Sequence, residues 1–505
     1  MLRRAWAWAR QPQAVPATRE FVGQDPPDVL VTAPWLVDAR AAVVFVTVAA
    51  GVVLASRYGV VGQSVALGLA SLLFTVALVR RYRTRREIAF FLLLPTILSA
   101  TQNLFVVAVA RDLSPSQTKF FFTVNVLLAL IILVVLGAGR TTRSGLRRGI
   151  GGITLVCLIT LTVYGLGSAV VVHSKPLSAL ASLRNVATPM LFMLIGLCAS
   201  RLASLKAYLR GLVALGILVM AFGIVELSVP NLWQDFGIKH LWDNKGLLIN
   251  RDTGLPPNYY SSEMLRGHQL RRMVASFADP INLGTFLFAL SMACWRLRRR
   301  ALVAVVLVAS VLAVSKGALL SQLVFAACWA RYRASRTVLI ATLVVVAGAG
   351  LAFYGFTLRS STGSTAAHVG GLVDALVDLP QHPFGRGLGK AGVLASLFGE
   401  GSGSVGAESG IGVVVSQLGV VGLGAYGAFF FALAQAIKNL DDLPDRVLVV
   451  TLLVAFILNG AFDEVAFSPN SAAPYFLIIG LVLGRIDRPV GREVRRLDSN
   501  RACPS

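Results

Sequence analysis

Long apolar runs alternate with short basic segments along most of the chain, and this pattern limits the folds open to it. Since 56% of the residues are hydrophobic and 14% are charged, a water-soluble globular fold does not fit the sequence. Fourteen apolar runs are candidates for helices that cross a bilayer. We therefore predict an all-α, polytopic integral membrane bundle of about 12 to 14 transmembrane helices over residues 41–484. The runs are Ala41–Ser56, Gly59–Val79, Ile88–Ala110, Phe120–Ala138, Ile150–Val172, Val186–Ser200, Leu212–Leu227, Ile281–Trp295, Ala301–Val314, Ala318–Ala330, Thr337–Phe356, Ile411–Ile437, Val447–Asn459 and Ala473–Gly484.

The charges between the runs predict the orientation of the bundle. With the amino terminus inside, the short inner loops carry 21 Lys and Arg residues, whereas the short outer loops carry five. The tails, residues 1–40 and 485–505, are then cytoplasmic. The net charge of +23 is explained by these inner loops, so no nucleic-acid partner is expected. Because Arg outnumbers Lys 39 to 8, which is typical of GC-rich bacterial genes, we expect a bacterial plasma membrane protein.

One apolar stretch and two outer loops depart from the regular alternation. The stretch Ala301–Ala330 has basic segments on both sides and must cross twice, so we predict a helix pair broken at Ser315, Lys316 and Gly317. The outer loops 228–280 and 358–408 are longer than most connections, which favours a function there.

Each long loop has a distinctive composition. The first carries aromatic residues of the kind that bind sugars at a surface, namely Trp233, Trp242, Tyr259 and Tyr260. The second contains the segment GEGSGSVG, residues 399–406, which predicts a mobile, lid-like loop.

The sequence indicates neither a metal nor a cofactor. Four cysteines lie in apolar runs and the fifth lies in the basic tail, and no two histidines have metal-ligand spacing. Asp463 and Glu464 form an outer acidic pair that could bind a divalent cation, but two solvated acids in a loop are the favoured interpretation.

Several cations gather on the predicted outer side. Arg184 precedes the sixth run, Arg271 and Arg272 lie just before the eighth, and Lys316 lies at the helix break. Arg386 and Lys390 flank a Gly-rich segment of the second loop. Such groups bind phosphate oxygens without a metal, although contact with lipid headgroups explains Arg184 or Arg271 equally well. A lysine between two apolar half-helices is costly, which favours a function for Lys316.

The order of four segments resembles the O-antigen ligase and polysaccharide polymerase family of bacterial membrane glycosyltransferases. The segments are RMVASFADPINLGTF, AVSKGALLSQLVF, QHPFGRGLGKAG and ESGIGVVVSQLGVVGL, and they cover roughly residues 271–422. Lys316 stands where the family usually has Arg, and Glu408 stands where the ligases have His. The remaining residues resemble the family only in their pattern of spans.

The resemblance implies metal-independent, inverting transfer of a glycan from undecaprenyl pyrophosphate to an acceptor hydroxyl, outside the cytoplasm and without a cofactor. Glu408, Arg272 and Lys316 would be catalytic, with Glu408 as the base and His382 as the alternative base. Arg271, Arg184 and Arg386 would bind the pyrophosphate. Asp279, His382 and Glu226 are candidate contacts to the acceptor, and Glu226 is equally well explained as the partner of an Arg or as a water-facing carboxylate.

Polymerisation of lipid-linked repeat units into O-antigen, capsule or exopolysaccharide is the function that we expect from these features. Its partners would be the lipid-linked oligosaccharide, membrane lipids, a chain-length regulator and a flippase. Ligation to a lipid or protein acceptor is the near alternative, and the absence of the ligases' His-Asn pair favours polymerisation. A flippase or other transporter would place its charges along the middle of several helices rather than at one mouth.

Overall fold

The computed structural model of the chain describes residues 85–111, 113–122, 124–137, 149–265, 268–360, 364–400 and 408–485. All of its described elements belong to one compact unit, Val52–Ser505. The predicted amino-terminal tail and the runs Ala41–Ser56 and Gly59–Val79 lie outside the described residues, as does the carboxyl-terminal tail beyond Arg485.

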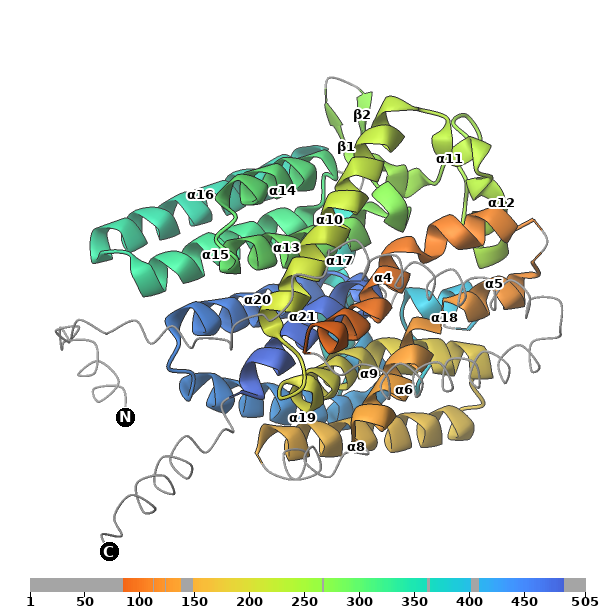
Figure 1. Cartoon of the computed structure of the whole chain (residues 1–505). Helices are drawn as coiled ribbons and strands as arrows, with labels where there is room; N and C mark the ends of the chain where they lie inside the picture. Colours follow the sequence, from red (N-terminus) through yellow and green to blue (C-terminus); the bar gives the residue numbers. More distant parts are fainter. Residues whose placement is uncertain are drawn as a thin grey trace, which may run out of the picture. The chain divides into compact units, whose positions relative to one another are not determined.

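Helices make up nearly the whole of the described chain, which confirms the all-α polytopic membrane fold (Figure 1). Six of the described helices are long and apolar enough to cross a bilayer. They are α4 (Arg85–Val109), α8 (Ile150–Val171), α9 (Pro176–Ala199), α10 (Leu205–Ser228), α19 (Gly410–Lys438) and α20 (Leu443–Phe462). The total of about 12 to 14 spans stays a prediction.

The other predicted runs that the structure describes also form helices. Phe120–Ala138 divides into α5 (Pro115–Phe121) and α6 (Val124–Gly137), so this run is not the single helix that we expected. The remaining helices follow the predicted runs closely and are α13 (Pro280–Arg296), α14 (Arg300–Leu312), α15 (Lys316–Arg333), α16 (Arg336–Ser360) and α21 (Pro469–Leu483).

Helix α9 is the central buried helix, and glycines let it approach α21 closely. A Cβ at Gly196 would lie 2.6 Å from the Leu477 carbonyl oxygen, and one at Gly480 would lie 2.5 Å from that of Met193. Such close backbone contact is typical of helices packed within membranes. Helix α8 instead packs on both α9 and α19 at the edge of the bundle (Figure 1). Its side chains Val163 and Val170 are exposed, as expected of a lipid-facing helix.

The beginning of α9 corrects one predicted boundary. The sixth run was expected to start at Val186 with Arg184 ahead of it, but the helix starts at Pro176 and contains Arg184. Hydropathy fails here because the first turns carry polar residues whose polar groups are satisfied inside the protein. Ser178 donates to the Gly389 carbonyl at 2.7 Å, and Ser182 accepts from Gln417 at 3.3 Å.

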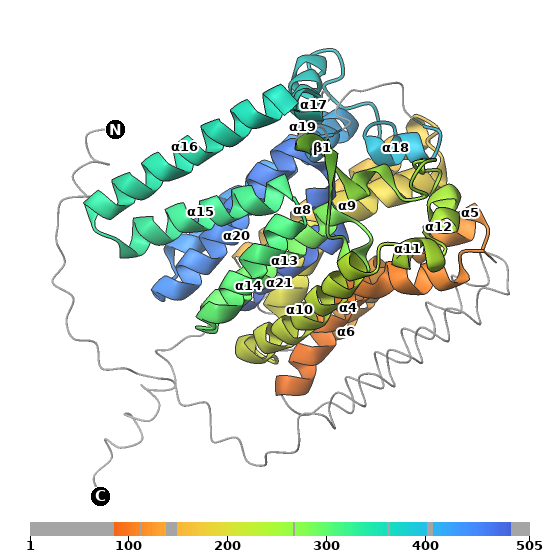
Figure 2. The same ribbon diagram turned by 90° about the horizontal axis from the view of Figure 1, so that it is seen from above.

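The predicted helix break is confirmed at Ser315, whereas Lys316 and Gly317 belong to the helix that follows. Helix α14 ends at Leu312, Val314 has a φ of 46°, and α15 begins at Lys316. The Ser315 side chain caps the new helix by accepting from the Ala318 N–H at 3.4 Å. Helix α15 then runs beside α16, as Figure 2 shows.

The first long loop is folded rather than extended. It contains α11 (Leu232–Asp235), α12 (Ile238–Lys245), η2 (Pro257–Tyr259), a hairpin of β1 (Tyr260–Leu265) and β2 (His268–Arg271), and η3 (Ala275–Phe277). Trp233, Trp242 and Tyr259 are buried in one aromatic cluster, with the Trp242 and Tyr259 rings 6.2 Å apart. The expectation that these three rings form a sugar-binding surface is therefore wrong. They form the core beneath the loop.

The second long loop contains α17 (Ser364–Asp378) and α18 (Val393–Leu397). Residues 401–407, which hold most of the predicted lid GEGSGSVG, lie outside the described residues.

Candidate functional site

The amino-terminal ends of α13, α15 and α21 meet. Gly284 in α13 packs directly on the Ser315 side chain, where a Cβ would overlap it. Asn282 accepts hydrogen bonds from Ser468 at 3.2 Å and Ser471 at 3.3 Å, at the start of α21. Because the aligned peptide dipoles give each helix start a partial positive charge, their convergence favours an anion.

Arg272 links this meeting point to the helix break. Its Nε and Nη2 donate to the carbonyl oxygens of Ala313 and Val314, each at 3.1 Å. These carbonyls follow the last turn of α14, where a guanidinium is favourable. The structure thus anchors Arg272 to main-chain carbonyls two and three residues before Lys316.

The residues that follow Glu408 and Lys316 both contact one segment, the end of α20. Ser409, which follows Glu408 and caps α19, donates to the Gly460 carbonyl at 3.4 Å. Gly317, which follows Lys316, lies so close to Asn459 that a Cβ would be 2.5 Å from its Oδ1. Thus the three residues predicted to be catalytic come from distant parts of the sequence and gather around the same helix ends.

Asp279 lies at the same mouth, where it caps α13. Its carboxylate accepts from the Asn282 N–H at 3.1 Å and from the Asn258 side chain at 3.0 Å. Asp279 is half-buried.

Arg271 and Glu226 are engaged with each other. The Arg271 guanidinium lies 2.5 Å from the Glu226 carboxylate and stacks 4.7 Å from the centre of the Tyr259 ring. The other Glu226 oxygen accepts from the N–H groups of Val274 and Ala275. Glu226 is 1% exposed, so the water-facing interpretation is wrong and its pairing with an Arg is confirmed. This burial leaves little of its carboxylate for an acceptor, and the pair instead fixes the hairpin on α10.

Arg386 and His382 form a triad with Asp378. Arg386 donates to both Asp378 oxygens, at 2.8 and 2.7 Å, and His382 Nδ1 lies 3.1 Å from one of them. The Arg386 hydrogen bonds lower the pKa of Asp378, and the same contact raises that of Arg386. Arg386 hydrogen-bonds to Asp378 at the end of α17 and, through its main chain, to Ser416 in α19. Arg272 hydrogen-bonds to the residues that follow α14, so the triad and Arg272 contact different elements.

A kink in α19 holds the segment that carries Arg386. Gly419 has a φ of 55° inside the helix, so the Val420 N–H bonds to the Pro383 carbonyl at 2.8 Å. The freed carbonyl of Ser416 accepts from the Arg386 N–H at 2.7 Å, and that of Gln417 accepts from Gly387. Two of the four segments of the family resemblance are therefore joined through their backbones.

Lys245 is a site residue that the sequence analysis missed. Its Nζ donates to Asn103 Oδ1 at 3.2 Å and lies over the rings of Phe122 and Trp242, 4.1 and 4.5 Å from their centres. Burial lowers the pKa of Lys245 to about 7; the charge of Asp279 opposes this shift and that of Arg184 adds to it. An isolated lysine in a polar loop carries no sequence signal, because the folding of the loop brings it to Asp279.

Arg184 and Glu464 extend this cluster toward α18. Arg184 donates to the Phe122 carbonyl at 2.9 Å, and Glu464 accepts from the Val393 N–H at 2.7 Å. Glu464 is buried, so the interpretation of this acid as solvated is wrong. Burial raises the pKa of Glu464 to about 7, and the negative charge of Asp463 also raises it. The hydrogen bond from the Val393 N–H and the positive charge of Arg184 lower it by smaller amounts. Perturbed groups in one cluster are typical of a functional site.

Among the described residues, no group of three His, Cys, Asp or Glu side chains is arranged to hold a metal ion. No family model matches the sequence, and the search of curated proteins gives no match.

Proposed function

We propose that this membrane protein polymerises undecaprenyl-pyrophosphate-linked oligosaccharide repeat units into O-antigen, capsule or exopolysaccharide at the outer face of the plasma membrane. One observation carries the proposal. The starts of α13, α15 and α21 meet beside Arg272 and Lys316, and the residues that follow Lys316 and Glu408 contact the same end of α20. Guanidinium and ammonium groups beside helix starts suit a pyrophosphate leaving group.

The reaction is an inverting displacement without a metal. The acceptor hydroxyl attacks the anomeric carbon, a new C–O bond forms, and the bond to the pyrophosphate oxygen breaks. Glu408 takes the hydroxyl proton, with His382 as the alternative base, while Arg272 and Lys316 stabilise the charge that develops on the leaving group. Arg184, Arg271 and Arg386 belong to the same proposal as donor-binding groups, and Arg184 fits it best because its charge acts on Lys245, which in turn interacts with Asp279.

The proposal is tested by the length of the surface glycan in a deletion strain that carries variants of the gene. Arg272→Ala, Lys316→Ala and Glu408→Ala are each expected to reduce long polymer at least tenfold. Lys239→Ala, an exposed residue of the first long loop, serves as the control and keeps the normal length. Full-length polymer with all three variants would reject the catalytic assignment, provided that the variants reach the membrane in normal amounts.

Purified protein separates the proposed polymerase from its alternatives. The protein is mixed in detergent with a lipid-linked repeat unit, with no membrane and no gradient. Longer lipid-linked chains support polymerisation, whereas products that appear only after another lipid or protein acceptor is added indicate a ligase. A flippase joins no sugars under these conditions. Co-purification would test the chain-length regulator and the flippase as partners.

A further inference from the structure

A cavity of about 310 Å³ is lined by residues that are not among those assigned to glycan transfer. It is bounded by the end of α5, the start of α9 and the end of α18, and its volume is at the lower end of the range for small-molecule sites. The lining residues are Lys119, Lys175, Pro176, Leu177, Leu397 and Phe398.

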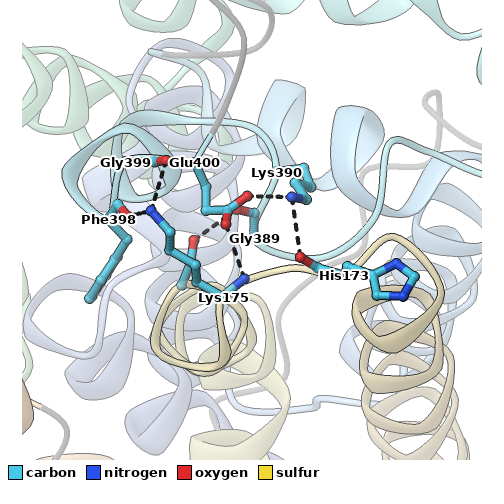
Figure 3. A network of polar contacts seen from close by, with 8 residues as sticks. His173, Lys175, Gly389, Lys390, Phe398, Gly399 and Glu400 are labelled. Carbon is cyan, nitrogen blue, oxygen red and sulfur yellow. Dashed lines mark hydrogen bonds and ion pairs between the residues drawn. The ribbon is translucent and has the colours of Figure 1, made fainter.

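Two ammonium groups stand at this cavity in fixed positions. Lys175 Nζ donates to the carbonyl oxygens of Phe398 and Gly399, at 2.9 and 3.1 Å (Figure 3). Lys119 Nζ donates to the Leu397 carbonyl at 3.0 Å and lies 4.8 Å from the centre of the Phe398 ring. An ammonium group has three N–H donors, so these contacts leave each lysine with donor capacity for a ligand.

The Glu400 carboxylate offsets part of this positive charge and also binds a third ammonium group, that of Lys390. One of its oxygens accepts from the main-chain N–H of Lys175 at 3.2 Å, and the other is bound by the Lys390 ammonium (Figure 3). The Lys390 hydrogen bond lowers the pKa of Glu400, which keeps this carboxylate ionised and paired with Lys390. Positive charge therefore remains at the mouth of the cavity, which favours an anion.

The walls of the cavity define the rest of the ligand. Apart from the two lysines they are apolar, and Pro176 and Leu177 begin α9, a helix long enough to span the membrane. Leu177 and Leu180 on the same turns are 39% and 51% exposed. The cavity is thus placed where a span meets the polar headgroups, so its ligand combines an anionic group with a hydrocarbon chain.

We propose that this cavity binds a lipid phosphate, with the phosphate oxygens between Lys119 and Lys175 and the hydrocarbon chain along Leu177 and Leu180. Two sources have this chemistry, an anionic phospholipid and a polyprenyl phosphate. The inference depends on the membrane fold and on these contacts, and it does not depend on the proposed polymerase activity.

Binding to the purified full-length protein in neutral detergent tests the proposal, with dioleoylphosphatidylglycerol, dioleoylphosphatidylcholine and farnesyl phosphate as probes. Affinity is measured by native mass spectrometry. At least one anionic probe is expected to bind tenfold or more tightly than phosphatidylcholine. Preference for phosphatidylglycerol identifies a phospholipid site, and preference for farnesyl phosphate identifies a prenyl carrier site. Equal binding of all three probes would reject the proposal.

Variants locate the binding. The pair Lys119→Gln and Lys175→Gln is expected to weaken the anionic probe at least tenfold, whereas Lys119→Arg with Lys175→Arg retains it. Lys239→Gln removes one exposed lysine elsewhere and has no effect. Leu177→Trp fills the cavity and keeps both charges, so it weakens binding without a charge change. Unchanged affinity of the double Gln variant for the anionic probe would contradict binding at this cavity. If the double Gln variant does not fold, unchanged affinity of a folded Leu177→Trp variant would contradict it.

Discussion

A single buried carboxyl group, Glu464, makes the stability of the protein depend on pH. Its pKa is raised from 4.5 to about 7 by burial. Between these values the folded state holds a proton that the unfolded state releases, so the free energy of unfolding falls as pH rises from about 4.5 to about 7. A shift of this size corresponds to roughly 3 kcal/mol.

Glu464→Gln is expected to remove this pH dependence and to raise the thermal midpoint most at pH 8. The amide has no proton to lose, and its oxygen can still accept from the Val393 N–H. The midpoint of the detergent-purified protein is measured from pH 5 to pH 8, against Asp235→Asn as a control at an exposed acid. Comparison at each pH cancels the contribution of Lys245. Parallel curves for Glu464→Gln and the natural protein would contradict the assignment.

The Glu226–Arg271 pair provides a second test at the residue scale. Glu226→Leu leaves a half-buried guanidinium and two N–H groups without their carboxylate, so we expect a loss of a few kcal/mol. Removing both charges with Glu226→Leu and Arg271→Met is expected to restore part of the stability. The thermal midpoints of the single and double variants decide this, and equal midpoints would mean that the charges are not coupled.

At the scale of the element, the kink of α19 should tolerate no side chain at its centre. Gly419→Ala places a Cβ against the Pro383 carbonyl at a φ of 55°, and it opposes the backbone bonds that hold the loop. We expect a loss of several kcal/mol, measured as a lower thermal midpoint. Gly427→Ala in the same helix meets open space and is expected to stabilise by up to about 1 kcal/mol. Equal effects of the two changes would show that the kink is not required.

The elements also show what the sequence could predict. Hydropathy located the apolar helices and the break at Ser315, because lipid exposure and basic flanks leave a local signal. It misplaced the start of α9, since the polar residues there bond to the second long loop and to α19, more than 200 positions away. Lys245 had no local signal for the same reason, and the loop aromatics were misread because burial depends on tertiary contacts.

At the scale of the whole molecule, α19 fixes the two sides of the membrane. Its 29 residues are enough to cross a hydrocarbon core of roughly 30 Å in spite of the kink at Gly419. We therefore expect Glu408 on one side and Lys438 on the other. Gly412 in its first turn packs on the Gly371 carbonyl, so α17 is on the same side as Glu408.

Labelling of introduced cysteines tests which side faces out. A membrane-impermeant maleimide is expected to modify Lys239→Cys and Asp374→Cys in intact cells, and Arg201→Cys and Lys438→Cys only after the cells are opened; all four positions are exposed. The natural cysteines are replaced first. If intact cells were labelled at Lys438→Cys but not at Lys239→Cys or Asp374→Cys, the end of the bundle with Arg272 and Lys316 would face the cytosol. The proposed polymerisation at the outer face would then be rejected, whereas the lipid-phosphate site would stand, because both leaflets contain phosphate lipids.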